Sequence, residues 1–503
     1  MNTTMNSKIK ILLDLKPALD GYAGIPQETR LLFRGLRSVE RYDVEGLIQH
    51  GGRKLRSGVK FRKNQSVSRR INRISRVIVS LYEKPYRNMY EAVLDAIDSY
   101  AQRSILRTRA IFGHALKPSI FESAHFEDFV WRTFFAKTLD VSDKKLVTAT
   151  NFRVLDVPRT MMHKVGIAGM KYSSNPSYIK VGTVGYDFFL AQTPFPGRVS
   201  DSTKLLVRYH DAVPVLMPHT INDKAFHQAS HFQALQSNVR SGAWFVCVSE
   251  ATRKDLLKIF PEAEPRSAVI HNIVSSDYFN EESPKGLVHQ IIRNRLSSVE
   301  AFASSVKQIN VDFESQINDD FQYLLMVSTL EPRKNHLLLL NAWERLKYTT
   351  MPKLKLVVVG GTGWDSGPIL QAFRPWAERG ELFYLNDVHA AELRILYKHA
   401  RATICPSLAE GFDYSGVEAM RSGGVVIASD IPVHREVYGG AAEYFNPYST
   451  EDATLVMQRV LSEEGVAIRK NLRNASIEVG ERYLPENILP QWEALLEHIG
   501  TQK

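Results

Sequence analysis

Cysteine is nearly absent from this chain of 503 residues. The two cysteines, Cys247 and Cys405, lie far apart and show no CxxC spacing. A disulfide framework and a zinc ribbon are therefore excluded, because both need several closely spaced thiols. The composition predicts a protein of a reducing compartment.

Long hydrophobic runs are also missing. The first apolar segment, from Ile11 to Leu15, is short and interrupted by charge, which does not fit a signal peptide. No later stretch approaches the roughly 18 uncharged apolar residues that are needed to span a bilayer. These absences predict a cytoplasmic protein, either free or peripheral at the inner face of a membrane.

The chain does contain enough apolar residues for a large core, with 44% hydrophobic, 10% aromatic and 23% charged residues. This composition is that of a folded protein, and the length fits two or three domains. The 64 Lys and Arg exceed the 54 Asp and Glu, which gives a formal net charge of +10. The excess indicates an anionic partner, for which nucleic acid, phosphorylated ligands and acidic membrane all qualify.

Acidic residues are missing altogether between Arg53 and Arg76, although this segment carries ten cations. The cations are Arg53, Lys54, Arg56, Lys60, Arg62, Lys63, Arg69, Arg70, Arg73 and Arg76. The region from about residue 50 to 145 reads as a mostly helical insertion in the first domain. A charge run is usually a solvated face, but apolar residues between these cations also favour contact with an anionic membrane or lipid phosphates. Nucleic acid is not expected as a partner, since no nucleic-acid-binding module accompanies the segment.

Strands that alternate with helices organise the rest of the chain. Residues 8–15 read as a buried strand, followed by a loop with Gly21 and Gly24 and by Pro26, which suits the first turn of a helix. Further apolar runs of strand length occur at residues 146–150, 187–191, 205–209, 244–248 and 268–270. After a polar stretch, apolar runs of strand length occur again at residues 323–327, 354–359, 382–385, 402–405 and 425–428. This alternation predicts two α/β domains with parallel sheets.

The segment from Pro406 to Gly424 carries the most informative polar residues of the second half. It follows a buried strand and runs into a helix that ends at a pair of glycines. On one continuous helix Glu410 and Glu418 would lie about 80° apart, so they do not share a face. We therefore place Glu410 and Gly411 in the loop and Glu418 on the helix. The loop then brings backbone N–H groups and a helix N-terminus to the carboxyl ends of the sheet, where anionic nucleotide groups bind.

This arrangement resembles the retaining GT-B glycosyltransferases of glycosyltransferase family 4, which carry two glutamates separated by seven residues in an E-G-F-G-x-x-x-x-E-A-M pattern. Residues 329–335, TLEPRKN, resemble the family's basic motif for the donor phosphates, and Gly360 and Gly361 follow the next strand. Residues 386–400 and 429–437 resemble further segments of the family. Together these matches cover nearly all of residues 321–447.

The first domain matches the same family more sparsely. Residues 21–24 resemble the glycine loop under the donor diphosphate, and His210 resembles the strand-end histidine that faces the reacting sugar. The resemblance implies an α/β fold of GT-B architecture, with two Rossmann-like parallel-sheet domains that face each other across a cleft. It implies an N-terminal acceptor-side domain (1–279), a linker (280–320), a C-terminal nucleotide-sugar-binding domain (321–484) and a C-terminal helix (485–503) that packs back on the first domain.

The resemblance also assigns roles to residues. Glu410 is expected beside the donor sugar, where it opposes positive charge at the anomeric carbon, and His210 is expected over the reacting sugar. Glu418 is expected to accept hydrogen bonds from the ribose hydroxyls. The remaining donor-binding residues are Gly21, Gly24, Thr329, Arg333, Lys334, Gly411 and Phe412. Neither a metal nor a cofactor is expected, because cationic side chains stabilise the departing phosphate.

Two positions depart from the family pattern. Thr329 stands where many relatives carry Arg, and Arg333 is a candidate substitute for that phosphate contact. Asp413, Tyr414 and Ser415 replace the family's G-L-P, which places a carboxylate beside the expected phosphates.

The function that the resemblance implies is retaining, metal-independent transfer of a hexose in the synthesis of a cell-surface polysaccharide such as lipopolysaccharide. The TLEPRKN form of the basic motif resembles that of bacterial mannosyltransferases, which makes GDP-mannose the expected donor. A glycan or a lipid-linked oligosaccharide is the expected acceptor. Two alternatives stay open: a non-catalytic sugar-nucleotide-binding partner of another transferase, and a GT-B epimerase or phosphorylase.

Overall fold

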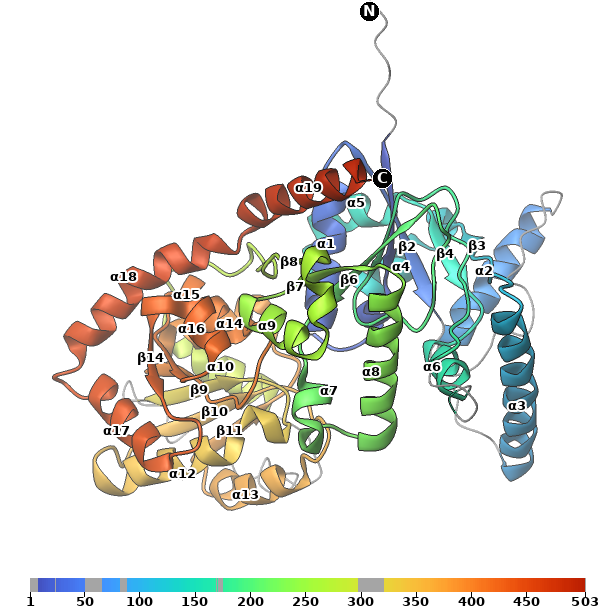
Figure 1. Cartoon of the computed structure of the whole chain (residues 1–503). Helices are drawn as coiled ribbons and strands as arrows, with labels where there is room; N and C mark the ends of the chain where they lie inside the picture. The colour runs from blue at the N-terminus through green and yellow to red at the C-terminus, as the bar shows by residue number, and fades with distance from the viewer. Residues whose placement is uncertain are drawn as a thin grey trace, which may run out of the picture.

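The computed structural model describes residues 8–22, 24–49, 66–81, 88–168, 170, 175–296 and 321–502. The chain forms two parallel-sheet domains, with the N-terminal domain on the right of Figure 1 and the C-terminal domain on the left. Of the cations between Arg53 and Arg76, those from Arg53 to Lys63 lie outside the described residues.

The first domain is built on an eight-stranded sheet with the order β3-β4-β2-β1-β5-β6-β7-β8. Its strands are β1 (Ile9–Asp14), β2 (Tyr42–Gln49), β3 (Ser119–Phe121), β4 (Phe152–Leu155), β5 (Phe188–Ala191), β6 (Lys204–Tyr209), β7 (Trp244–Cys247) and β8 (Ser267–Val269). Its helices are α1 (Ile25–Ser38), α2 (Val67–Leu81), α3 (Met89–Ile111), α4 (Glu127–Val130), α5 (Lys144–Thr148), α6 (Arg159–Ala168), α7 (Val213–Leu216), α8 (Lys224–Arg240) and α9 (Glu250–Ile259). The β3–β4 pair is antiparallel and the β1–β2 and β1–β5 pairs are parallel. The central strand β1 is apolar and buried from Ile11 to Leu13, as in parallel sheets that are covered on both faces.

The second domain is built on a six-stranded sheet with the order β11-β10-β9-β12-β13-β14. Its strands are β9 (Tyr323–Val327), β10 (Lys355–Val359), β11 (Leu382–Leu385), β12 (Ala402–Cys405), β13 (Val426–Ser429) and β14 (Ala442–Phe445). Its helices are α12 (His336–Thr349), α13 (Gly367–Glu378), α14 (Ala390–His399), α15 (Tyr414–Arg421), α16 (Pro432–Tyr438), α17 (Thr450–Leu461) and α18 (Val466–Arg482). All of its strand pairs are parallel. The GT-B architecture of two Rossmann-like domains is therefore confirmed.

One expected strand is wrong. Most of residues 146–150 belong to the short helix α5, where Thr148 Oγ1 donates to the Lys144 carbonyl at 2.8 Å. The strand of this region is β4, which pairs with β2. A short apolar run fits a buried helical turn as well as a strand, so periodicity could not separate the two.

The first strand leads into α1 through the glycine loop. Gly24 has φ 70 and is the N-cap of α1, and Pro26 lies in the first turn. The positive φ favours glycine at this position, and proline is preorganised for a helix start. The loop and the N-terminus of α1 consequently lie at the carboxyl end of the central strand.

In its described residues the insertion is mostly helical, but it also adds the strand β3 at the edge of the first sheet. Two of its cations contact this edge. Arg70 pairs with Glu122 at 2.8 Å, and the buried Arg73 donates to the Ile120 carbonyl at 3.3 Å. These two guanidinium groups therefore help to attach the insertion to the sheet. Within the described part of the chain, no helix is both long and apolar enough to cross a bilayer.

Two segments connect the domains. Inside the expected linker, residues 286–295 form α10 (Gly286–Arg295), which packs on α14 and β11 of the second domain. After α18 the chain crosses back to the first domain as α19 (Pro485–Thr501), which lies against α1 (Figure 1). The α19 side chain Trp492 is fully buried, and the guanidinium of Arg208 on β6 lies 5.3 Å from its ring centroid.

Candidate active site

A cleft of about 1100 Å³ lies between the two domains. Its walls come from the loops that follow β1, β6, β9, β10, β11 and β12, and thus from the carboxyl ends of both sheets. All ten residues that the sequence singled out line this one cleft: Gly21, Gly24, His210, Thr329, Arg333, Lys334, Glu410, Gly411, Phe412 and Glu418. The two domains therefore bring together residues that lie far apart in the sequence.

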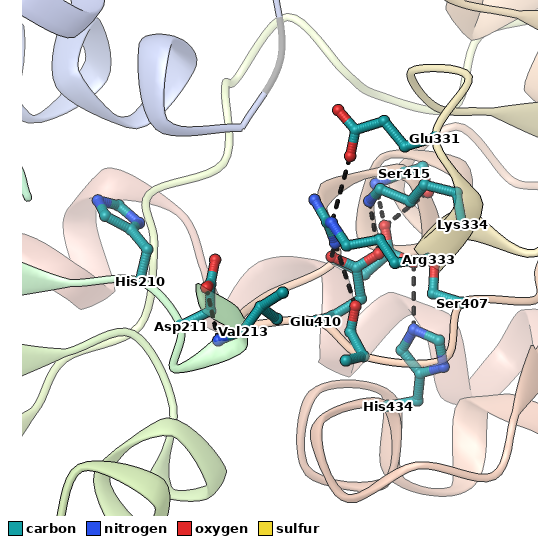
Figure 2. Close-up of polar contacts among 12 residues, drawn as sticks. His210, Asp211, Val213, Glu331, Arg333, Lys334, Ser407, Glu410, Ser415 and His434 are labelled. Atoms are coloured by element: carbon teal, nitrogen blue, oxygen red, sulfur yellow. Dashed lines mark hydrogen bonds and ion pairs between the residues drawn. The ribbon is translucent and has the colours of Figure 1, made fainter. Parts of the chain in front are cut away.

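Glu410 lies between two cations at the centre of this site (Figure 2). Lys334 Nζ is 2.5 Å from Glu410 Oε1, and Arg333 Nη1 is 3.0 Å from Glu410 Oε2. Arg333 Nε also pairs with Glu331 at 3.2 Å. Burial would raise the pKa of Glu410, but the charges of Lys334 and Arg333 hold it below its usual value. The carboxylate is consequently ionised and fixed in position.

The local sequence explains why the cations reach this point. Pro332, Arg333 and Lys334 form a tight turn after β9, and the following Asn335 adopts a left-handed conformation with φ 61 before α12 begins. The backbone N–H of Leu408 donates to the Arg333 carbonyl at 2.8 Å. This bond ties the loop that carries Glu410 to the turn that carries the two cations.

His210 lies on the opposite wall, directly after β6 (Figure 2). Its imidazole is buried, and its Nε2 atom has no hydrogen-bond partner among the described residues. Burial and the nearby Arg208 lower the pKa of His210 to about 3, so the ring is neutral near pH 7. The next residue, Asp211, accepts a hydrogen bond from the Val213 backbone N–H at 3.0 Å. A neutral ring nitrogen is thus available to a ligand in the cleft.

The loop of the second domain contacts the strand end of the first domain at Gly411. A Cβ atom at Gly411 would lie 1.7 Å from the His210 carbonyl oxygen, far inside van der Waals contact. Only glycine permits this approach. The glycine after Glu410 therefore allows the two walls of the cleft to meet.

Glu418 projects from α15 and is held from both domains. Gln27, in the first turn of α1, donates to Glu418 Oε1 at 2.9 Å, and Tyr397 OH donates to Oε2 at 3.2 Å. Burial raises the pKa of Glu418 to about 7. Gln27 was not predicted as a site residue; its only signal in the sequence was a polar residue next to Pro26 at a helix start beside the glycine loop.

Residues 413–415 are the segment that differs from the family pattern. The Asp413 carboxylate of this segment caps the N-terminus of α15. Asp413 accepts hydrogen bonds from the Ser415 backbone N–H at 3.1 Å and from its hydroxyl at 2.6 Å. His434 Nε2 lies 3.3 Å from the other Asp413 oxygen. Burial opposes ionisation, but these contacts and the charge of Lys334 hold the pKa of Asp413 well below its usual range. Asp413 thus has partners in its own domain, and the sequence analysis missed His434.

Two further groups of polar contacts join the domains. Tyr414 OH donates to Glu28 of α1 at 2.9 Å, and Glu28 forms a fully buried ion pair with Arg208 at 2.9 Å. Glu436 of α16 accepts hydrogen bonds from the N–H groups of Glu250 and Ala251, at 2.6 and 2.9 Å. A carboxylate at the N-terminus of α9 is favourable because the helix dipole is positive there. The structure thus fixes the relative position of the two domains through buried polar contacts.

Comparison with known proteins finds similarity to one family over part of the chain. Residues 307–479 match the family described as Glycosyl transferases group 1. O-antigen chain mannosyltransferase B of Escherichia coli is 27% identical over 216 residues, which cover 43% of this chain and 50% of that protein. O-antigen chain mannosyltransferase RfbU of Salmonella typhimurium is 25% identical over 254 residues, which cover 48% of this chain and 61% of that protein. The match thus spans about half to three fifths of the length of these relatives.

Solved structures share the overall fold. Sucrose-phosphate synthase from Thermosynechococcus elongatus superposes with a TM-score of 0.59 at 13% identity, over 99% of this chain and 100% of that one. HepE from Anabaena, solved in complex with UDP, superposes with a TM-score of 0.52 at 14% identity, over 97% of this chain and 100% of that one. The fold and the cleft define a protein of the GT-B class. Its C-terminal domain matches the group 1 glycosyltransferases, and the chain resembles bacterial mannosyltransferases.

Proposed function

We propose that this chain is a retaining glycosyltransferase that moves mannose from GDP-mannose to a glycan or lipid-linked oligosaccharide during synthesis of a cell-surface polysaccharide. The observation that carries the proposal is the position of Glu410, which two cations hold in a cleft lined from both domains. The names of the O-antigen mannosyltransferases to which the chain is similar support the choice of sugar.

In the proposed reaction the donor diphosphate binds beside Lys334, Arg333 and the N-terminus of α1. A lysine ammonium has three N–H donors, so Lys334 can bind a phosphate oxygen while it keeps its bond to Glu410. As the bond between the anomeric carbon and the phosphate oxygen breaks, negative charge grows on the diphosphate. Fixed cations in a cleft lower the energy of that charge without reorganising. No metal is needed in this scheme.

Glu410 then faces the sugar, where it binds hydroxyls and opposes the positive charge that develops at the anomeric carbon. The neutral ring of His210 orients the sugar from the other wall. The acceptor oxygen forms its bond on the face that the phosphate leaves, and a phosphate oxygen takes the acceptor proton. The nucleoside diphosphate departs, and the anomeric configuration is retained.

A thermal-shift screen of nucleoside diphosphates and nucleotide sugars, followed by a transfer assay, tests the proposal. We expect GDP and GDP-mannose to raise the melting temperature most, because a ligand that binds the native state stabilises it. Transfer should persist in chelator and give an α-linked product by NMR. Donor binding without transfer would support the non-catalytic alternative, and loss of activity in EDTA that manganese restores would contradict the metal-free scheme.

A further inference from the structure

The helix α3 exposes large apolar side chains to solvent. It begins at a regular N-cap, where the Asn88 side chain accepts a hydrogen bond from the Glu91 N–H at 2.9 Å. The exposed residues and their exposed fractions are Met89 84%, Tyr90 72%, Val93 52%, Leu94 46%, Ile97 62%, Tyr100 70%, Ile105 48% and Ile111 65%. We call this set the α3 apolar face. Figure 1 shows α3 at the edge of the first domain farthest from the second domain.

The members of the α3 apolar face lie on one side of the helix. At about 100° per residue they fall within an arc of about 160°. Glu91, Asp95 and Asp98 fall outside this arc, Arg107 falls at its edge, and the buried residues Leu106 and Ala110 point to the other side. The helix contacts α6 of its own domain. It therefore packs on the protein through one side and presents a nearly uncharged apolar face on the other.

Such a face needs a partner. Soluble proteins rarely expose contiguous apolar patches of this extent unless they bind something there. The cleft does not use α3, since none of its residues lines the cleft. The proposed transfer reaction accordingly gives this surface no role.

We propose that the α3 apolar face lies on the surface of an anionic lipid bilayer. A helix with one wide apolar face and tyrosines within it suits the boundary between headgroups and acyl chains, because tyrosine has an apolar body and a polar tip. Charge supports the same partner: the segment that precedes α3 carries ten cations and no acid between Arg53 and Arg76. Arg70 and Arg73 attach the insertion to the first sheet, whereas Arg69 is exposed. Exposed cations close in the sequence to an apolar helix favour anionic headgroups.

A second copy of the chain fits the face less well. Two helices that pair through a coiled-coil seam bury only a narrow stripe, whereas this face spans an arc of about 160°. A flat bilayer surface can cover the whole arc. The inference does not depend on the transferase activity, so membrane binding and transfer can fail separately.

The first test compares two triple variants in vesicle flotation. V93S/I97S/Y100S removes three members of the α3 apolar face, and V466S/I477S/Y448S removes the same residue types, similarly exposed, from the second domain. The probe is vesicles of phosphatidylglycerol and phosphatidylethanolamine, with pure phosphatidylcholine vesicles as the neutral comparison. We expect the native chain to float with the anionic vesicles, the α3 variant to bind at least about tenfold more weakly, and the control variant to bind normally.

Salt and oligomeric state separate the remaining explanations. Binding that weakens as salt rises supports a contribution from the cations. Binding by the α3 variant equal to that of the native chain would overturn the proposal. So would a native dimer in light scattering that the α3 variant converts to a monomer, because the face would then be an interface between copies.

A fluorescence variant keeps the proposal testable if the triple variant misfolds. Ile97→Trp places a fluorophore at the centre of the α3 apolar face, and Ile477→Trp serves as the matched control. Phospholipids brominated in their acyl chains should quench the fluorescence of the added tryptophan at position 97. The fluorescence of the added tryptophan at position 477 should stay unchanged. Equal quenching in both variants, or none in either, would show that α3 does not enter the bilayer surface.

Discussion

Single residues in the cleft are placed by charge pairing, and Glu410 is the centre of that pairing. Its carboxylate contacts Lys334 and Arg333, so replacing it changes both the charge near the sugar and the cations that face the phosphates. The two effects act on different steps. Kinetic constants can therefore separate them.

Glu410→Gln keeps the shape of the side chain and removes its charge. We expect kcat to fall by roughly 10²–10³, because an electrostatic contact with the developing positive charge is lost. Affinity for the nucleoside diphosphate should not fall, since the anion that competes for Lys334 is gone. Initial rates and calorimetry measure the two quantities, and circular dichroism checks the fold. A kcat near the native value would remove Glu410 from the mechanism.

Lys334→Ala should act mainly on donor binding. A hydrogen bond to a charged group contributes about 1.5–3 kcal/mol, which corresponds to roughly a 10- to 100-fold higher Kd for the nucleoside diphosphate. Calorimetry gives the Kd directly. Lys347→Ala is a suitable control, because Lys347 pairs with Glu381 at 2.7 Å and does not line the cleft. Equal affinities of the two variants would contradict the assignment.

The raised pKa of Glu418 predicts that the stability of the protein depends on pH. Its pKa is raised to about 7 in the folded chain from 4.5, so between these values the unfolded state loses the proton first. The free energy of unfolding therefore falls as pH rises through this window, by about 3 kcal/mol in all. In the Glu418→Gln variant, the free energy of unfolding should not show this part of the decrease with rising pH. Denaturant unfolding at pH 5 and pH 8 measures it, and parallel curves for both proteins would show that Glu418 does not titrate in this range.

At the scale of elements, the second sheet was predictable because its strands are uninterrupted apolar runs bounded by polar loops. Strands β9, β11 and β12 have the bounds that these runs indicate, and β14 was missed. In the first domain, β2, β3 and β4 were also missed, and the run at residues 146–150 proved to be mostly helix α5. Length and periodicity do not distinguish a short buried turn of helix from a short strand.

The site was predictable as far as residues close in sequence define it. The spacing of Glu410 and Glu418 indicated a loop followed by a helix, and the structure places them so. The contacts that join the domains were not predictable. Gln27 and Glu418 lie 391 positions apart, and no local pattern marks that pair.

Gly411→Ala tests how closely the two loops must approach. The added Cβ would clash with the His210 carbonyl, which belongs to the other domain, so the domains should move apart while each keeps its fold. We expect a large loss of kcat with a small change in the unfolding free energy. Gly367→Ala is the control, because a Cβ there meets nothing within 4 Å. Native activity in Gly411→Ala would mean that the loop adapts without cost.

For the whole molecule, the two domains share buried structure beyond the cleft. One continuous cluster of buried apolar side chains runs from β1 and α1 of the first domain to Tyr483 and Trp492 at the C-terminal end. The buried ion pair between Glu28 and Arg208 lies in the same region, and Tyr414 joins it from the second domain. Each domain also has an apolar core cluster of its own, so the shared cluster joins two domains that each contain a core.

Trp492→Ala tests this coupling. Trp492 is fully buried in α19, so its removal leaves a cavity and takes the ring away from Arg208. Substitutions of this kind cost about 3–5 kcal/mol of unfolding free energy. Because α19 attaches the C-terminal end of the chain to the first domain, we also expect unfolding in denaturant to separate into two transitions. Gln491→Ala, an exposed change on the same helix, should alter the unfolding free energy by less than about 0.5 kcal/mol. A single transition within about 1 kcal/mol of the native value would show that α19 rests on the first domain without holding the two domains together.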